Sequence, residues 1–145
     1  MSLHRIHLRG PWQLEWNSGA KAFADKTTVQ KIRLPADWND LFGAFSGRVR
    51  LTRVFHQPTN LAPNEKVELV FQEWPGVWAI SLNQHHVAEF RDSTPESPQR
   101  ITITTLLQPT NVLSAETQIE QSAEEKTPRG LMGKIAIEIR ANEAS

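Results

Sequence analysis

The chain has 145 residues, which is enough for one domain with its own hydrophobic core. Its 16 Lys and Arg residues balance 16 Asp and Glu residues, so it lacks the basic excess that is typical of nucleic-acid-binding proteins. It contains no cysteine, which excludes disulfides and thiolate chemistry. We therefore expect a single domain over residues 1–145 that has no nucleic-acid partner.

The beginning of the chain carries charges and no apolar core, so it is not typical of a secretory signal. No run approaches the roughly 20 consecutive apolar residues that span a bilayer. Together with the lack of cysteine, these observations predict a cytoplasmic protein without a membrane partner.

Short segments in which apolar and polar residues alternate recur along the chain, and no long helical period interrupts them. This period of two is the mark of half-buried strands, and Gly, Pro and Asn residues separate the segments. The expected strands are 4–8, 12–16, 29–34, 48–55, 67–71, 77–82, 86–90, 100–106, 111–116 and 134–140. Such a series predicts an all-β fold, an antiparallel β-sandwich or jelly roll.

The stretch 67–87 is the centre of this pattern. Two apolar runs there place on one face of their strands Val67, Leu69, Phe71, Trp78, Ile80 and Leu82. Pro75-Gly76 predicts a chain reversal between the two runs. Asn83-Gln84 predicts a second tight turn, because Asn tolerates positive φ better than most residues.

Three arginines lie close together in the strand expected over 48–55. Alternation places Arg48 and Arg50 on one face and Arg53 on the other. They indicate either a solvated strand face, which is the commoner case, or a local basic patch.

If every strand reverses direction, the loops alternate between the two ends of the sandwich. Loops 36–47, 73–76, 91–98 and 118–133 then meet at one end, and loops 56–66, 83–85 and 107–110 meet at the other.

The first of these ends collects side chains suited to a carbohydrate. The candidate binding residues are Asp37, Trp38, Asn39, Glu73, Trp74, Arg91, Asp92 and Arg129. An aromatic face can stack on a sugar ring while carboxylate, amide and guanidinium groups bind its hydroxyls. The alternative is that Trp38 and Trp74 close the end of the sandwich as core residues.

Other chemistry finds less support in the sequence. Asp37, Asp40 and Asp92 could hold a structural calcium together with loop carbonyls, but their spacing is not diagnostic. No other cofactor or metal is indicated. Glu124 and Glu125 are adjacent, so they cannot hold the separation of roughly 5–9 Å that a pair of glycosidase carboxylates requires. We therefore expect no catalytic residue in this chain.

Five segments, in order along the chain, resemble motifs of one family. Residues 10–14 (GPWQL) resemble its "GxW" opening, and residues 34–38 (LPADW) resemble "VPxxW". Residues 47–55 (GRVRLTRVF) are similar to "G-x-x-x-Y-R-R-x-F". Residues 79–87 (AISLNQHHV) are similar to "VWVNGxxV", and residues 104–113 (TTLLQPTNVL) to "TDLLKPGENVL". The family is the sugar-binding domain of glycoside hydrolase family 2.

The resemblance implies a galactose-binding-domain-like jelly roll, such as the N-terminal accessory domain of β-galactosidases and β-glucuronidases. In those enzymes the catalytic carboxylates lie in a separate barrel. Three features depart from the family: Leu51 replaces an aromatic residue, Gln84 replaces the turn glycine, and residues 124–135 lack the family's tryptophan.

The expected function is therefore a non-catalytic carbohydrate-binding or accessory module. Its partners would be a carbohydrate or the catalytic domain of a glycoside hydrolase. The alternatives are a structural protein–protein interaction module without a ligand and a degenerate fragment of a glycoside hydrolase. The sequence does not determine which sugar is bound or how many copies associate.

Overall fold

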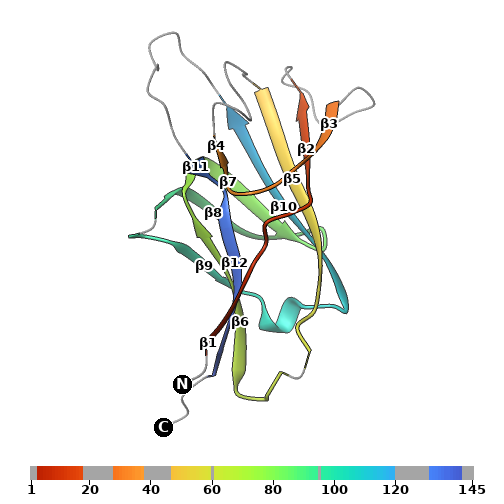
Figure 1. Cartoon of the computed structure of the whole chain (residues 1–145), viewed down its shortest axis with the longest axis vertical. Helices are drawn as coiled ribbons and strands as arrows, with labels where there is room; N and C mark the ends of the chain where they lie inside the picture. Colours follow the sequence, from red (N-terminus) through yellow and green to blue (C-terminus); the bar gives the residue numbers. More distant parts are fainter. Residues whose placement is uncertain are drawn as a thin grey trace.

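The computed structural model describes residues 3–17, 28–37, 47–59, 61–94, 96–119 and 131–141. Two antiparallel sheets face each other in it (Figure 1). The four-stranded sheet has the order β1 (Leu3–His7), β12 (Lys134–Ala141), β6 (Glu65–Gln72) and β9 (Gln99–Thr102). Each neighbouring pair of strands in this sheet is antiparallel.

The second sheet has six strands. Their order is β3 (Thr28–Ile32), β2 (Trp12–Asn17), β5 (Gly47–His56), β10 (Thr110–Ile119), β7 (Trp74–Leu82) and β8 (His85–Ser93). A short pair of strands, β4 (Ala36–Asp37) and β11 (Leu131–Met132), lies beside them. The predicted all-β antiparallel jelly-roll sandwich is confirmed. Among the described residues, no helix has the length and apolar character needed to cross a membrane.

The core lies between the two sheets and is built from the inward side chains of both. The apolar face predicted for the central stretch is buried, with at most 1% of any of its side chains exposed: Val67, Leu69, Phe71, Trp78, Ile80 and Leu82. Neighbouring strands of both sheets add to this core. Trp12 and Leu14 come from β2 in the six-stranded sheet, and three isoleucines come from β12 in the four-stranded sheet, and all of these are buried. Alternation therefore identified the buried face of most strands correctly.

The chain reversal predicted at Pro75-Gly76 is wrong. β6 and β7 belong to different sheets, so the segment between them is a crossover and not a hairpin turn. The direction changes at Glu73, which has a φ of 59°, and the peptide N–H of Gly133 donates to its carbonyl oxygen at 2.9 Å. Pro75 and Gly76 lie inside β7, within an irregularity of its pairing between Trp74 and Val77.

The turn predicted at Asn83-Gln84 is confirmed. Both residues have positive φ, 53° and 70°, which is the requirement of a two-residue hairpin turn of type I′. The Asn83 side chain ties the turn to β10, because its Oδ1 accepts the Val112 N–H at 2.8 Å and its Nδ2 donates to Asn111 Oδ1 at 3.1 Å.

The strand predicted over 100–106 ends earlier than expected. Pairing with β6 stops at Thr102, and Thr104–Leu106 forms a 3₁₀ turn, η1. Thr104 turns away because its Oγ1 accepts the Val67 N–H at 3.0 Å, while the Leu106 N–H donates to the Ile103 carbonyl at 2.9 Å. Local side-chain hydrogen bonds of Thr compete with strand pairing, and β propensity does not report them.

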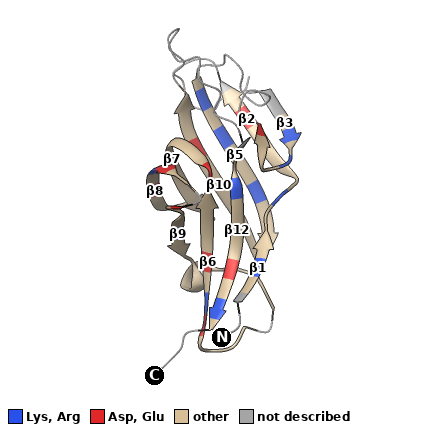
Figure 2. Cartoon of the chain, turned by 60° about the vertical axis from the view of Figure 1, so that its left-hand side comes forward, with Lys and Arg blue, Asp and Glu red and all other residues tan. Residues whose placement is uncertain are grey.

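A buried carboxylate, that of Glu138, belongs to β12 and lies on the outer face of the four-stranded sheet. Figure 2 shows acidic and basic residues along this strand. The Glu138 side chain, 2% exposed, accepts hydrogen bonds from Arg5 at 2.9 Å, Arg100 at 2.7 Å and Arg140 at 3.2 Å. Glu68 extends the network to Arg100 and Arg140, at 3.8 and 3.6 Å. Burial alone would raise the pKa of Glu138, but the hydrogen bonds from Arg100 and Arg5 outweigh it, so the pKa lies below its ordinary value.

We predict that Gln84→Gly stabilises the protein. An L-residue at positive φ costs roughly 1–2 kcal/mol, and glycine removes this cost while losing some entropy, so the gain should be about 0.5–1 kcal/mol. Chemical unfolding of both proteins measures it. Gln13→Gly, on a regular strand, is the control and should lower the free energy of unfolding. A loss of stability in Gln84→Gly would contradict the assigned turn.

We predict that Glu138→Gln lowers the free energy of unfolding by about 1–3 kcal/mol at pH 7, because hydrogen bonds to a charged group are lost. The folded-state pKa of Glu138 is depressed, so its contribution is present above the unfolded value of about 4.3 and is lost as pH falls through the folded value. Unfolding measured from pH 7 to pH 3 should therefore show the two proteins converging. The exposed carboxylate variant Glu89→Gln should change stability by at most about 0.5 kcal/mol.

Candidate functional site

The structure gathers several of the predicted site residues at one end of the sandwich. Asp37 in β4 pairs with Leu131 in β11, and the next residues along the chain reach the crossover, where Gly133 binds Glu73. Asp92 reaches the same crossover from the end of β8. The predicted alternation of loops therefore holds for these residues. Trp38, Asn39, Asp40 and Arg129 lie outside the described residues.

Trp74 is a core residue at this end. Its side chain is 0% exposed, and its ring packs edge-on against Phe71, with centroids 5.2 Å apart, and against Trp78, at 4.8 Å. Its Nε1 donates to the Lys134 carbonyl at 2.8 Å, so its one polar group is also satisfied. No face of the ring is available to a sugar. This corrects the place of Trp74 among the carbohydrate-binding candidates and supports the packing alternative for it.

The acidic side chains beside Trp74 hold the crossover in place. Asp92, with a φ of 51°, accepts the Gly76 N–H at 2.6 Å through Oδ1. Glu73 Oε1 lies 3.5 Å from Lys134 Nζ, while its Oε2 is buried without a hydrogen-bond partner. Among the described residues, no three His, Asp or Glu side chains lie close enough to share a metal ion. Calcium binding through Asp37, Asp40 and Asp92 stays a prediction, because Asp40 lies outside the described residues.

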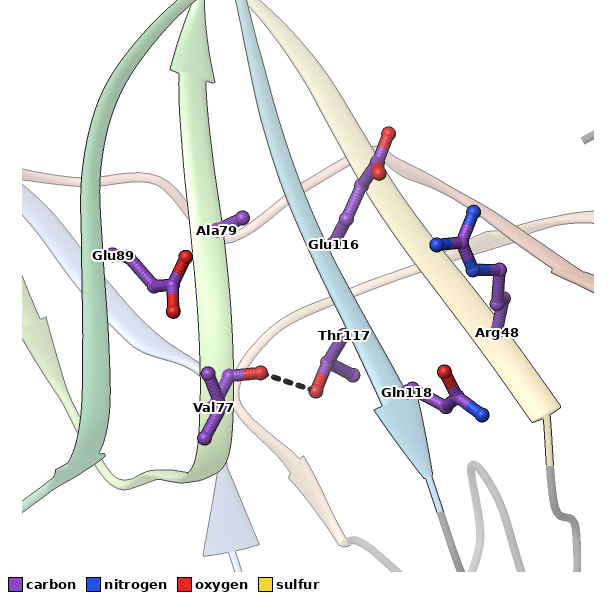
Figure 3. A pocket seen from close by; sticks show the side chains of 7 residues that line it. All are labelled: Arg48, Val77, Ala79, Glu89, Glu116, Thr117 and Gln118. Carbon is purple, nitrogen blue, oxygen red and sulfur yellow. Dashed lines mark hydrogen bonds between the residues drawn. The ribbon is translucent and has the colours of Figure 1, made fainter. Parts of the chain in front are cut away.

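A hollow of about 250 Å³ opens on the outer face of the six-stranded sheet (Figure 3). It is lined by residues from four strands, β5, β10, β7 and β8: Arg48, Glu116, Thr117, Gln118, Val77, Ala79 and Glu89. Arg91, another of the predicted site residues, pairs with Val77 across β7 and β8 beside this hollow, and not with the end cluster.

The hollow exists because a short side chain lies between longer ones. In the cross-strand register Glu116 pairs with Ala79, and Ala79 pairs with Glu89, so two carboxylates flank one methyl group. The pairing of β10 with β7 also ends at Glu116 and Ala79. Beyond this point the Thr117 hydroxyl donates to the Val77 carbonyl at 2.5 Å, so a side chain replaces the ladder where the two strands part.

Arg48 and Arg50 share the outward face of β5, as predicted, and each lies beside a different residue of β10. Arg50 binds Glu15 and also lies 3.5 Å from Glu116, so it is part of a cross-strand charge network. Arg48 pairs across the sheet with Gln118 at the edge of the hollow. Arg53 points the other way, as predicted, and donates to the Gly10 carbonyl at 3.3 Å; burial lowers its pKa.

The lining of the hollow complements hydroxyl groups. Carboxylates accept hydrogen bonds, the Arg48 guanidinium donates them, and the Gln118 amide does both. Alternation in the sequence could identify Arg48, Glu116 and Gln118 as outward residues. It could not show that they meet Ala79 and Glu89, because that depends on which strands are neighbours.

Comparison with known proteins gives a result at the level of structure. No family model matches the sequence, and no curated protein matches it. A β-glucuronidase from an uncultured Clostridium species superposes with a TM-score of 0.75 and 16% identity, over 97% of this chain and 29% of the enzyme. The FMN-binding β-glucuronidase of Faecalibacterium prausnitzii superposes with a TM-score of 0.72 and 17% identity, over 94% of this chain and 22% of the enzyme. The β-glucuronidase of Bifidobacterium dentium superposes with a TM-score of 0.66 and 13% identity, over 97% of this chain and 30% of the enzyme.

This chain has the fold of one part of bacterial β-glucuronidases. At these identities the likeness is one of fold, and it confirms the fold that the five motifs imply. The chain spans between 22% and 30% of the length of these three β-glucuronidases.

We predict that Trp74→Ala lowers the free energy of unfolding by about 3–5 kcal/mol, because it empties a large buried site. Urea unfolding followed by circular dichroism measures the change. The control is Val54→Ala, at a side chain 53% exposed, which should cost no more than about 0.5 kcal/mol. If Trp74→Ala behaved like Val54→Ala, the packing role of Trp74 would be wrong.

Proposed function

We propose that this chain is a non-catalytic accessory module related to those of glycoside hydrolases, and that it binds carbohydrate. The observation that carries the proposal is the fold, which matches almost the whole chain to less than a third of each β-glucuronidase compared. Such a match supports a module that acts beside a catalytic domain. The five motifs support the same relationship.

The described carboxylates support a non-catalytic role. A glycosidase needs a general acid whose pKa is raised by an apolar pocket. Glu116, with 44% of its side chain exposed, and the exposed Glu89 are open to solvent at the margins of the hollow, so neither is enclosed in such a pocket. Glu138 is buried, but its arginine partners lower its pKa and hold it ionised, which is the opposite of what an acid requires.

A structural protein–protein interaction module is the second candidate. It is favoured by the end of the sandwich, where Trp74 is packed and Asp92 is committed to the Gly76 N–H. The described residues of that end, Trp74 and Asp92, are therefore committed to packing and to the backbone rather than to a sugar.

The purified chain should bind at least one saccharide on a glycan array and should not hydrolyse aryl β-glucuronides or aryl β-galactosides. A whole β-glucuronidase serves as the positive control for hydrolysis. Binding without hydrolysis supports the proposed function. If the chain bound no saccharide on the array, the structural module would be favoured. Hydrolysis by this chain alone would contradict the non-catalytic role.

A further inference from the structure

We propose that the hollow on the outer face of the six-stranded sheet is the carbohydrate site of this chain, and that it prefers a neutral sugar ring to a uronic acid. The inference rests on the proposed function, that the chain binds carbohydrate. It adds the place of binding and the class of sugar.

The size and floor of the hollow suit a single ring. Its volume of about 250 Å³ lies just below the range of about 300–1,000 Å³ that is common for small-molecule sites. Ala79 and Val77 form an apolar floor, and Val77 is 37% exposed. The apolar face of a pyranose can lie on such a floor while its hydroxyls point toward the margins.

The margins carry the polar groups at suitable intervals. Glu116 and Glu89 lie one strand to either side of Ala79, so their Cα atoms are separated by about two strand spacings, or roughly 10 Å. A ring above Ala79 would have a carboxylate acceptor on each side. In the next row, Arg48 and Gln118 offer donors from one side and Arg91 from the other. Equatorial hydroxyls could therefore find partners in several directions.

The same arrangement disfavours a uronic acid. A carboxylate placed above Ala79 would face the like charges of Glu116 and Glu89. Arg50 is already shared between Glu15 and Glu116. Arg48 and Arg91 lie one row farther along the strands, beside Gln118 and Val77, so a carboxylate above Ala79 is nearer to the two glutamates than to these cations. Like charges a few ångströms apart at a protein surface repel enough to weaken binding by about tenfold.

The test is an NMR titration of the ¹⁵N-labelled chain with methyl glycosides of glucose, galactose, mannose and xylose, and with methyl β-glucuronide. We expect a neutral glycoside to shift the amide signals of residues 77–79, 89 and 116–118. We expect methyl β-glucuronide to bind about tenfold more weakly than the neutral sugar that binds best.

Ala79→Leu fills the floor of the hollow and should weaken binding at least about tenfold by excluding the ring. Ser81→Leu is the matched control: Ser81 points outward from the same strand one row away, opposite Ser114. It should leave the affinity unchanged. Thermal unfolding verifies that both variants are folded. A variant with both Glu89→Gln and Glu116→Gln should remove the difference between neutral sugar and glucuronide.

Each outcome decides the inference. Shifts in the hollow that Ala79→Leu abolishes and Ser81→Leu retains support it. Saccharide binding that shifts other residues and survives Ala79→Leu would overturn it and leave the proposed function standing. Equal or tighter binding of glucuronide would overturn the preference for neutral rings. Failure to bind any saccharide on the array or in the titration would overturn the proposed function itself.

Discussion

The burial of Trp74 is the constraint on which the rest of this molecule depends. The chain leaves the four-stranded sheet at Gln72 and enters the six-stranded sheet at Trp74, so a single residue, Glu73, makes the crossover. The indole fills the space between the sheets against Phe71 and Trp78. The positive φ of Glu73 accompanies this location, and the start of β7 is secured by hydrogen bonds that the Trp74 and Gly76 N–H groups donate to the Ser93 hydroxyl and the Asp92 carboxylate.

The fold was largely predictable from local pattern, because each strand has an apolar face toward the core and a more polar face toward solvent. The core positions of β6, β7 and β12 follow from alternation alone, and the turn at Asn83-Gln84 follows from the tolerance of Asn for positive φ. The errors have a common origin in side-chain interactions across the molecule. Thr104 leaves the strand pattern to bind Val67, and Pro75-Gly76 lies inside a strand whose first residue, Trp74, is buried between the sheets.

The candidate site was less accessible to sequence reasoning. Composition predicted a polar, aromatic end, and the described ends of its loops, at Asp37, Glu73, Asp92 and Gly133, do meet, but contact with a ligand depends on exposure. Trp74 has none, Asp92 binds the Gly76 N–H, and Glu73 pairs with Lys134. The hollow depends on the register that pairs Ala79 in β7 with Glu116 in β10. The sequence alone does not show which outward residues of two separate strands will be neighbours, so this pairing could not be predicted.

The parting of β7 from β10 leaves a short ladder inside the six-stranded sheet. β10 pairs with β5 along its whole length, from Thr110 to Ile119, whereas its ladder with β7 runs only from Leu113 to Glu116. The β7–β8 hairpin is thus joined to the other four strands by a short seam. Side chains lengthen this seam at both ends, because Asn83 Oδ1 accepts the Val112 N–H and the Thr117 hydroxyl donates to the Val77 carbonyl. The attachment of the hairpin to β10 therefore rests on these two polar side chains as well as on backbone pairing.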